Sequence, residues 1–156
     1  MPEVRTIRQA QSQADVDRIN EFFNKNQIKA DLHWFTHSDT LERAFRRSDR
    51  RLFYMGVNQT IVGAAMVWCE SRVLDNEEAQ IRQVAVGPDV RGEGVGRQLC
   101  RASEEFASEF GQRQMIADVD KESPAVAFWE ATGYEPVDEW QTDSGRTMLR
   151  VKKQLD

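Results

Sequence analysis

The stretch VAVGPDVRGEGVGRQL, residues 84–99, constrains the fold more than any other part of the chain. It begins with a short apolar run, breaks at Gly87-Pro88, and places three glycines within five residues ahead of an amphipathic segment. A strand that runs into such a turn and then into a helix leaves amides unpaired at the helix start, where the helix dipole favours an anion. Glycine allows close approach of the backbone and positive φ. The stretch therefore predicts an anion-binding turn between a strand and a helix.

Two common phosphate-binding turns are excluded by the residues that follow the glycines. A P-loop needs Lys and then Ser or Thr after its last glycine, whereas Arg97 and Gln98 follow Gly96. A dinucleotide-binding fingerprint needs a third glycine at the place where Leu99 or Arg97 stands. A turn whose glycines serve only its geometry is the alternative interpretation.

Hydrophobic patterns along the rest of the chain predict a mixed α/β (α+β) fold with a mostly antiparallel sheet, in a single domain over residues 1–156. The predicted order is βααβββαβαββ, with one crossover in the middle. Helices are expected after Ser12, near residues 39–45, after the glycine turn and after Ser123 with Pro124. Strands are expected at 4–9, 51–57, 60–70, 79–86, 114–119, 135–141 and 146–153, with a two-residue turn at 58–59 and an irregular segment at 30–39.

The composition excludes several classes of function. The formal net charge of −5 argues against a general nucleic-acid binder. Cys69 and Cys100 belong to no CxxC pair, so we expect no disulfide framework and no metal site, and Cys100 is expected to be buried. No apolar run has the length of a membrane span or the character of a signal peptide. A cytoplasmic location is therefore expected.

The glycine turn resembles the acyl-CoA-binding motif of the GNAT superfamily of N-acetyltransferases, whose core pattern is Gln/Arg-x-x-Gly-x-Gly/Ala. Arg91, Gly94 and Gly96 fill the three defined positions. A second stretch, SPAVAFWEATGYEP at 123–136, is similar to the family's second CoA-contacting segment, with Trp129 where Tyr is common. The resemblance implies the GNAT fold, with a sheet that is splayed at the CoA site.

The resemblance also implies how acetyl-CoA is held. Unpaired strand groups at Val84 and Val86 would bind the pantetheine arm, and one of these amides would polarise the thioester carbonyl. Trp129 would cover the sulfur end of CoA. The pyrophosphate would lie against Arg91 and the backbone of Gly92, Glu93, Gly94, Val95, Gly96 and Arg97.

The implied reaction is transfer of acetyl from acetyl-CoA to a primary amine of a small molecule, peptide or protein, by direct attack in a ternary complex. A non-catalytic acyl-CoA-sensing module is the alternative, because Trp129 replaces the usual Tyr. Glu78 and Gln80 open the strand before the turn, where the family often draws a base or a proton relay. Tyr54 is a remote candidate for proton transfer, and Tyr134 is expected to lie in the core.

Three further features leave alternatives open. The run RAFRRSDRR at 43–51 fits a solvated helix face or a patch that attracts an acidic acceptor or a CoA phosphate. His33, Trp34 and His37 could line the acceptor pocket. The segment 146–154 could offer a sheet edge to a second copy, so a homodimer is expected.

Overall fold

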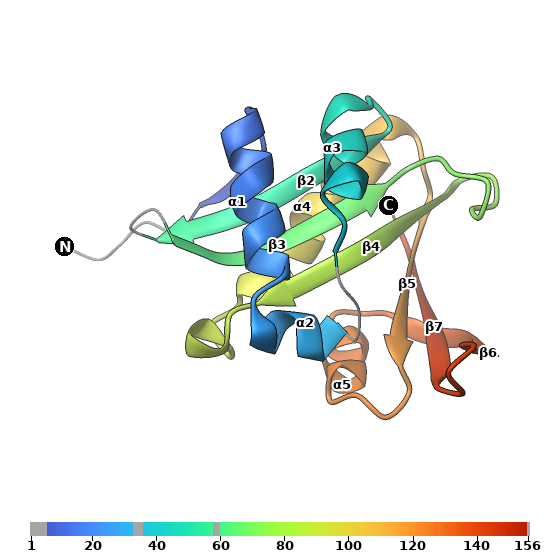
Figure 1. The fold of residues 1–156 in the computed structure, drawn as a ribbon. Coiled ribbons are helices and arrows are strands. Elements are labelled where there is room, and N and C mark those ends of the chain that lie inside the picture. Colours follow the sequence, from blue (N-terminus) through green and yellow to red (C-terminus); the bar gives the residue numbers. More distant parts are fainter. Residues whose placement is uncertain (1–5, 33–35, 58–59, 156) are drawn as a thin grey trace.

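The computed structural model describes residues 6–32, 36–57 and 60–155, and a sheet of seven strands forms its centre (Figure 1). The strands lie in the order β1-β2-β3-β4-β5-β7-β6. All neighbouring strands run antiparallel except β4 and β5, which are parallel. The bounds are β1 Ile7–Gln9, β2 Arg50–Val57, β3 Thr60–Trp68, β4 Glu78–Val86, β5 Gln114–Asp120, β6 Glu135–Gln141 and β7 Thr147–Gln154.

Helices cover both faces of the first half of the sheet. In Figure 1 α1 and α3 lie on one face of β2 and β3, and α4 lies on the other face. The alternation of β2 explains this arrangement, since Leu52 and Tyr54 join the core under α1 and α3 whereas Met55 joins the core under α4. The helices are α1 Gln13–Phe23, α2 Asn26–Leu32, α3 Ser38–Arg46, α4 Val95–Phe110 and α5 Ala125–Ala131, with a short 3-10 turn at Pro88–Val90.

The expected helix ends are partly confirmed. Ser12 caps α1 by accepting the amide of Asp15, and Gly111 ends α4 with a φ of 111°. Ser123 accepts the amide of Ala125, although the residue at the cap position of α5 is Pro124.

The predicted order lacks one helix, because α2 occupies residues 26–32, partly within the segment expected to be irregular. This helix has seven residues, and among those whose side chains are described only Ile28 is fully buried, so the sequence shows too little of a helical period. The predictions for His33, Trp34 and the turn at 58–59 lie outside the described residues.

The sheet divides between β4 and β5. Their pairing is limited to the first three residues of each strand, Glu78–Gln80 against Gln114–Ile116. Beyond this point the two strands diverge, as Figure 1 shows. The expected splayed sheet is therefore confirmed, and within the described part of the chain one edge of β4 from Ile81 to Val86 has no strand partner.

The C-terminal edge of the sheet differs from the prediction. We expected residues 146–154 to offer an edge, but β7 pairs with β5 on one side and β6 on the other. The edge strand is β6, which is exposed along its whole length, with Val137 52% and Trp140 41% exposed. Within residues 6–32, 36–57 and 60–155, no helix is long and apolar enough to cross a membrane.

Candidate functional site

The glycine turn brings the end of β4 to the start of α4 in a conformation that points amides outward. Gly92 and Gly94 have φ values of 83° and 85°, which favour glycine. Gly94 is the cap residue of α4 and supplies no side-chain hydrogen bond to the first turn. The amides of Val95, Gly96 and Arg97 have no carbonyl partner within the helix. The turn therefore presents a group of hydrogen-bond donors at the positive end of a 16-residue helix.

The glycines of this turn have different surroundings. A Cβ added at Gly92 or Gly94 would meet nothing within 4 Å, so the space above these residues is open. A Cβ at Gly96 would lie 3.3 Å from the ring of Phe128 and 3.4 Å from a methyl group of Val86. Gly94 thus serves the conformation of the turn, whereas Gly96 lets α4 approach α5 and β4 closely.

The free edge of β4 carries the backbone groups of Val84 and Val86. The amide of Gly87 donates to the carbonyl of Val62 on β3 at 2.7 Å. Because successive residues of a strand direct their backbone groups to opposite edges, those of Val84 and Val86 point into the gap beside β5. Arg91 lies at the same end, where its Nε donates to the carbonyl of Val86 at 3.4 Å.

The side chains of the remaining predicted cofactor residues lie in different environments. Val95 is the first residue of α4 and is buried against the sheet, and Arg97 and Glu93 are exposed. Trp129 is 4% exposed and belongs to the core, where its ring packs edge-on against Tyr134 at 4.9 Å and Phe128 at 5.3 Å. Trp129 therefore reaches the glycine turn through Phe128, the neighbour of Gly96.

Glu78 and Gln80 lie in the first three residues of β4, which pair with β5 just before the two strands separate. Both are buried, and Glu78 pairs with Nζ of Lys152 on β7 at 3.2 Å and accepts the amide of Asp75 at 3.3 Å. Gln80 accepts a hydrogen bond from Arg82 at 3.3 Å. The structure thus places a carboxylate and an amide together on one strand, beside the gap.

Tyr54 lies apart from this pair. It is buried under α1, where its hydroxyl donates to Asp15 at 3.4 Å, and β3 separates its strand from β4. Burial and then the charge of Asp15 raise the pKa of Tyr54, so the phenol stays protonated at neutral pH.

Tyr134 is a core residue, as expected. Its hydroxyl donates to Glu104 at 2.8 Å, and Lys153 binds the same carboxylate at 3.0 Å. Burial raises the pKa of this tyrosine far above its usual value. Burial also raises the pKa of the Cys100 thiol to about 12, so the expectation that Cys100 is an inert apolar residue fits the structure.

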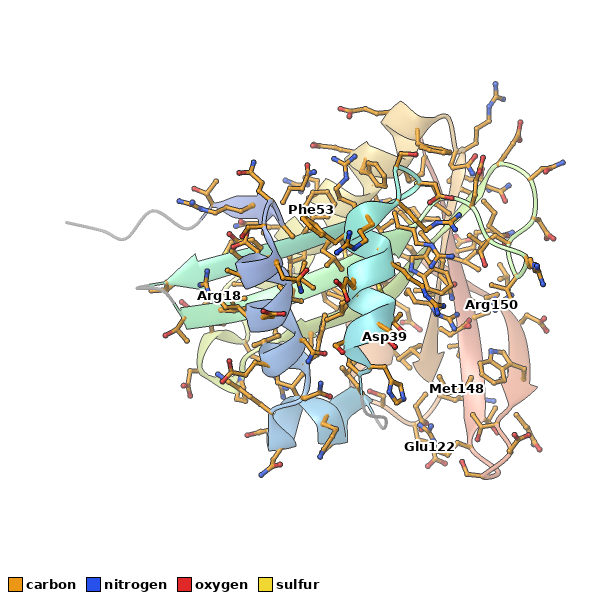
Figure 2. All side chains as sticks on the ribbon, turned by 45° about the horizontal axis from the view of Figure 1, so that its top comes forward. Arg18, Asp39, Phe53, Glu122, Met148 and Arg150 are labelled. Atoms are coloured by element: carbon orange, nitrogen blue, oxygen red, sulfur yellow. The ribbon has the colours of Figure 1, made fainter. Side chains whose placement is uncertain are left out.

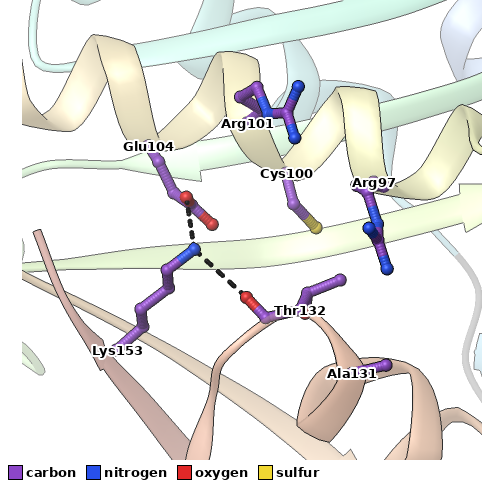
Figure 3. A pocket seen from close by; sticks show the side chains of 7 residues that line it. All are labelled: Arg97, Cys100, Arg101, Glu104, Ala131, Thr132 and Lys153. Carbon is purple, nitrogen blue, oxygen red and sulfur yellow. Dashed lines mark hydrogen bonds and ion pairs between the residues drawn. The ribbon is translucent and has the colours of Figure 1, made fainter.

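A shallow pocket lies beside the first turns of α4. Its volume is about 120 Å³, and Lys153 extends across it from β7 to reach both Glu104 and the carbonyl of Thr132 (Figure 3). Arg97 and Arg101 add two further cations to the wall formed by α4. The charge near the glycine turn is therefore mainly positive.

The structure adds residues that the sequence patterns did not reveal. Lys152 pairs with Glu78 although 74 positions separate them in the chain. Asp118, within β5, is held by two hydrogen bonds from Arg150 on β7, at 2.9 and 3.0 Å (Arg150 is labelled in Figure 2). No local pattern could name the partners in these pairs, because they depend on how β4, β5 and β7 come together. Across the described part of the chain, no three His, Cys, Asp or Glu side chains form a group that could hold a metal ion.

Comparison with known proteins places this geometry in a family. The model of the acetyltransferase (GNAT) family matches residues 15–134, which include the glycine turn and α5. The chain belongs to the GNAT family.

Individual relatives of this GNAT chain are distant. An uncharacterized N-acetyltransferase of Methanocaldococcus jannaschii is 28% identical over 137 residues, and the match covers 83% of this chain but 60% of that protein. Thus the chain spans less than two thirds of the length of this relative.

Solved structures agree in fold. The protein yncA of Salmonella typhimurium, solved with acetyl-CoA, has a TM-score of 0.78 at 21% identity, covering 99% of this chain and 95% of its own. The ribosomal-protein-S18-alanine N-acetyltransferase of Escherichia coli has a TM-score of 0.74 at 16% identity, covering 98% and 95%. These likenesses show the GNAT fold.

Proposed function

We propose that this GNAT protein is an N-acetyltransferase that moves the acetyl group of acetyl-CoA to a primary amine of a small molecule, peptide or protein. The observation that carries the proposal is the free edge of β4, which leads from the gap beside β5 directly into the glycine turn. Family membership and the acetyl-CoA in the yncA structure support the choice of donor.

The donor lies along β4 in this proposal. The pantetheine arm pairs with Val84 and Val86 as an added strand, and the pyrophosphate meets the amides from Gly92 to Arg97. The amide of Glu93 is the exception, because it donates to the carbonyl of Val90 at 3.3 Å. Arg91 supplies a positive charge at the same place. Trp129 supports this groove from inside by packing against Phe128.

The reaction is a single displacement at the thioester carbonyl. The amine nitrogen forms a bond to the carbonyl carbon, the C–S bond breaks, and its electron pair leaves with the CoA sulfur. The amide of Val84 stabilises the negative charge that develops on the carbonyl oxygen. No enzyme group bonds to the acetyl carbon, so the protein contributes orientation and proton transfer.

Glu78 is the proposed proton acceptor. An ammonium group must lose a proton before its nitrogen can attack, and the carboxylate held by Lys152 at the start of β4 would receive it through a chain of waters, because six residues, about 20 Å of strand, separate Glu78 from Val84. Gln80 cannot take a proton itself, but its amide can orient that water. The proposal gives Tyr54 no direct part, because α1 covers it and β3 lies between it and β4.

A panel of amines incubated with acetyl-CoA tests the function. We expect release of CoA, measured with a thiol reagent, together with an acetylated product found by mass spectrometry. Calorimetric binding of CoA without turnover on any amine would instead favour the acyl-CoA-sensing module. Absence of CoA binding would overturn both.

We also propose a homodimer that forms through the exposed edge strand β6. Val137 and Trp140 give this strand apolar surface, and its backbone edge beyond β7 is unpaired within the described residues. Light scattering that shows a monomer at high micromolar concentration would contradict the dimer.

A further inference from the structure

Two guanidinium groups stack on one tryptophan beside the proposed proton acceptor. Trp68 ends β3, with Arg50 of β2 opposite it on one side and Gln80 of β4 opposite it on the other. The Cζ of Arg50 lies 3.8 Å from the centre of the Trp68 ring, and the Cζ of Arg82 lies 4.6 Å from it. Directly opposite residues share a face of the sheet, so this cluster and Gln80 lie on the face that α3 covers. We call Arg50, Trp68 and Arg82 the guanidinium cluster.

The cations of this cluster lack the carboxylate partners that neighbouring arginines have. Arg47 binds Asp49 at 2.7 and 2.8 Å, and Arg150 binds Asp118 through two bonds. Among the described residues, Arg50 and Arg82 form no ion pair, and the side chain of Arg82 donates only to the neutral amide of Gln80. The carboxylates of Asp118 and Asp49 act on these two cations only from a distance, since each of them is bound directly to another arginine.

Two hydrogen-bond donors of the cluster are also unsatisfied. Nε of Arg50 and Nε1 of Trp68 are buried, and neither has a hydrogen-bond partner. A buried N–H without an acceptor is costly, and native structures rarely retain one without a reason. Burial, followed by the charge of Arg47, lowers the pKa of Arg50, which is a second sign that this group lies in an unfavourable environment.

The cluster lies close to the proposed reaction centre. Arg82 is the extra residue of a β-bulge, because Met66 pairs with Gln83 and Val67 with Ile81. Val84, whose amide would hold the thioester carbonyl, is two residues further along β4, which is about 7 Å of strand. A group held at Arg82 is therefore only a few bonds from an amine that attacks beside Val84.

We propose that the guanidinium cluster binds an oxyanion of the acceptor, a carboxylate or a phosphate within a few bonds of the amine that is acetylated. An oxyanion would accept from the outer N–H groups of the two guanidinium forks and give both cations a directly paired anion, and a guanidinium fork matches its geometry. This inference rests on the proposed function and narrows its acceptor class from any primary amine to an anionic amine, such as an amino acid.

Matched acceptors test the inference. Each common amino acid is compared with its primary amide, and O-phosphoethanolamine with ethanolamine, with rates expressed per unprotonated amine. We expect kcat/KM to favour the anionic member of the best pair at least tenfold. The pair that shows this preference distinguishes carboxylate from phosphate. Arg50→Met and Arg82→Met should each reduce that preference to about twofold or less.

Arg46→Met is the matched control, because Arg46 lies in the same arginine-rich stretch but is exposed and pairs with Glu42 at 3.1 Å. It removes the same charge and should leave the preference unchanged. Thermal unfolding of each variant checks that it is folded. If Arg50→Met does not fold, Arg82→Met still tests the inference, because Arg82 is an exposed residue of the bulge. A native protein without preference, or variants that slow both members of a pair equally, would overturn the inference.

A binding measurement separates this inference from the proposed function. N-acetylglycine and N-ethylacetamide, which differ in the carboxylate, are titrated calorimetrically into the protein with CoA present. We expect tighter binding of N-acetylglycine that weakens at least tenfold in Arg82→Met, even if no amine is turned over. Equal binding of the two probes, in a protein that does acetylate amines, would reject the cluster and leave the proposed function intact.

Discussion

Two functional surfaces meet along β4, and they are built from different parts of the chain. The surface that would hold the donor consists mainly of backbone, namely the free edge of β4 and the amides of a turn in which Gly92 and Gly94 leave open space. The surface that would hold the acceptor consists of side chains, with Glu78 and the guanidinium cluster contributed by three adjacent strands.

This difference determines how each surface can fail. A backbone surface depends on the φ angles of a few consecutive residues, so one added Cβ can remove it. The acceptor surface depends on the register of β2, β3 and β4, and on charges whose partners lie far away in sequence. Its single residues can therefore be exchanged with graded effects on rate and selectivity.

Trp129 is the sharpest test of where the donor surface ends. Trp129→Ala should lower the free energy of unfolding by about 3–5 kcal/mol, because a large buried ring is removed from the core. Trp129→Phe should lower the free energy of unfolding much less. Urea unfolding measures the change, and calorimetry gives CoA affinity per folded molecule. A large loss of CoA affinity with unchanged stability would show that the ring contacts the donor directly.

Gly94→Val should weaken CoA binding at least a hundredfold. The residue has a φ of 85°, and a side chain there would project into the open space over the amides. Gly145→Val is the matched control, because Gly145 has a φ of 89°, also meets nothing within 4 Å, and lies in the β6–β7 turn. Calorimetry checks both variants, and equal loss of affinity in the two would contradict the donor surface.

Gly96 is less suitable for this test than the sequence suggested. The glycine spacing predicts that a bulky residue there removes CoA binding and leaves the fold intact. In the structure its Cβ would approach Phe128 and Val86 within 3.4 Å, so Gly96→Val also disturbs packing between α4, α5 and β4.

Glu78→Gln should lower kcat/KM for amines about ten- to hundredfold, the lower end of the range for general-base catalysis. CoA affinity should not change, since Glu78 belongs to the acceptor surface. Glu77→Gln is the control, because the side chain of Glu77 is 60% exposed and only weakly paired with Arg113 at 3.9 Å. Steady-state kinetics measure kcat/KM for both variants. Equal values in the two would remove Glu78 from the mechanism.

The smallest expected effect is a loss of stability at high pH that comes from two buried cysteines, one behind each surface. Cys100 lies on α4 behind the glycine turn, and Cys69 follows Trp68; burial raises the pKa of each thiol to about 12. Unfolded thiols titrate near 8.5, so the native state retains protons that the unfolded state loses, and stability falls as pH rises above that value. At pH 9 we expect a loss of about 1 kcal/mol per thiol relative to pH 7.

Urea unfolding at the two pH values measures this loss, and Cys100→Ala should reduce it. A thiol reagent at pH 8 should leave the native protein unmodified and modify both cysteines in urea. Rapid reaction of either cysteine in the native protein would show that water reaches the interior behind that surface.

The two surfaces also differ in how far the sequence predicts them. The donor surface is local, so the spacing of Arg91, Gly94 and Gly96 was sufficient to place it between a strand and a helix. The residue for proton transfer was predicted only as a choice among Glu78, Gln80 and Tyr54, and the structure separates Tyr54 from the other two. The acceptor pocket was predicted at His33, Trp34 and His37, of which the first two lie outside the described residues. The stacking of Arg50 and Arg82 on Trp68 depends on strand register and on a bulge, which no local pattern specifies.

The short contact between β4 and β5 shifts the joining of the sheet from strand pairing to side-chain packing. Three residue pairs join the part made of β1 to β4 to the part made of β5, β7 and β6, and the ion pair between Glu78 and Lys152 spans the same junction. One core, with residues of β3, β4, α4, β5 and β7, packs across this junction. The width of the gap for the donor therefore depends on how that core is filled, so a substitution deep in the core can alter the donor surface without touching it.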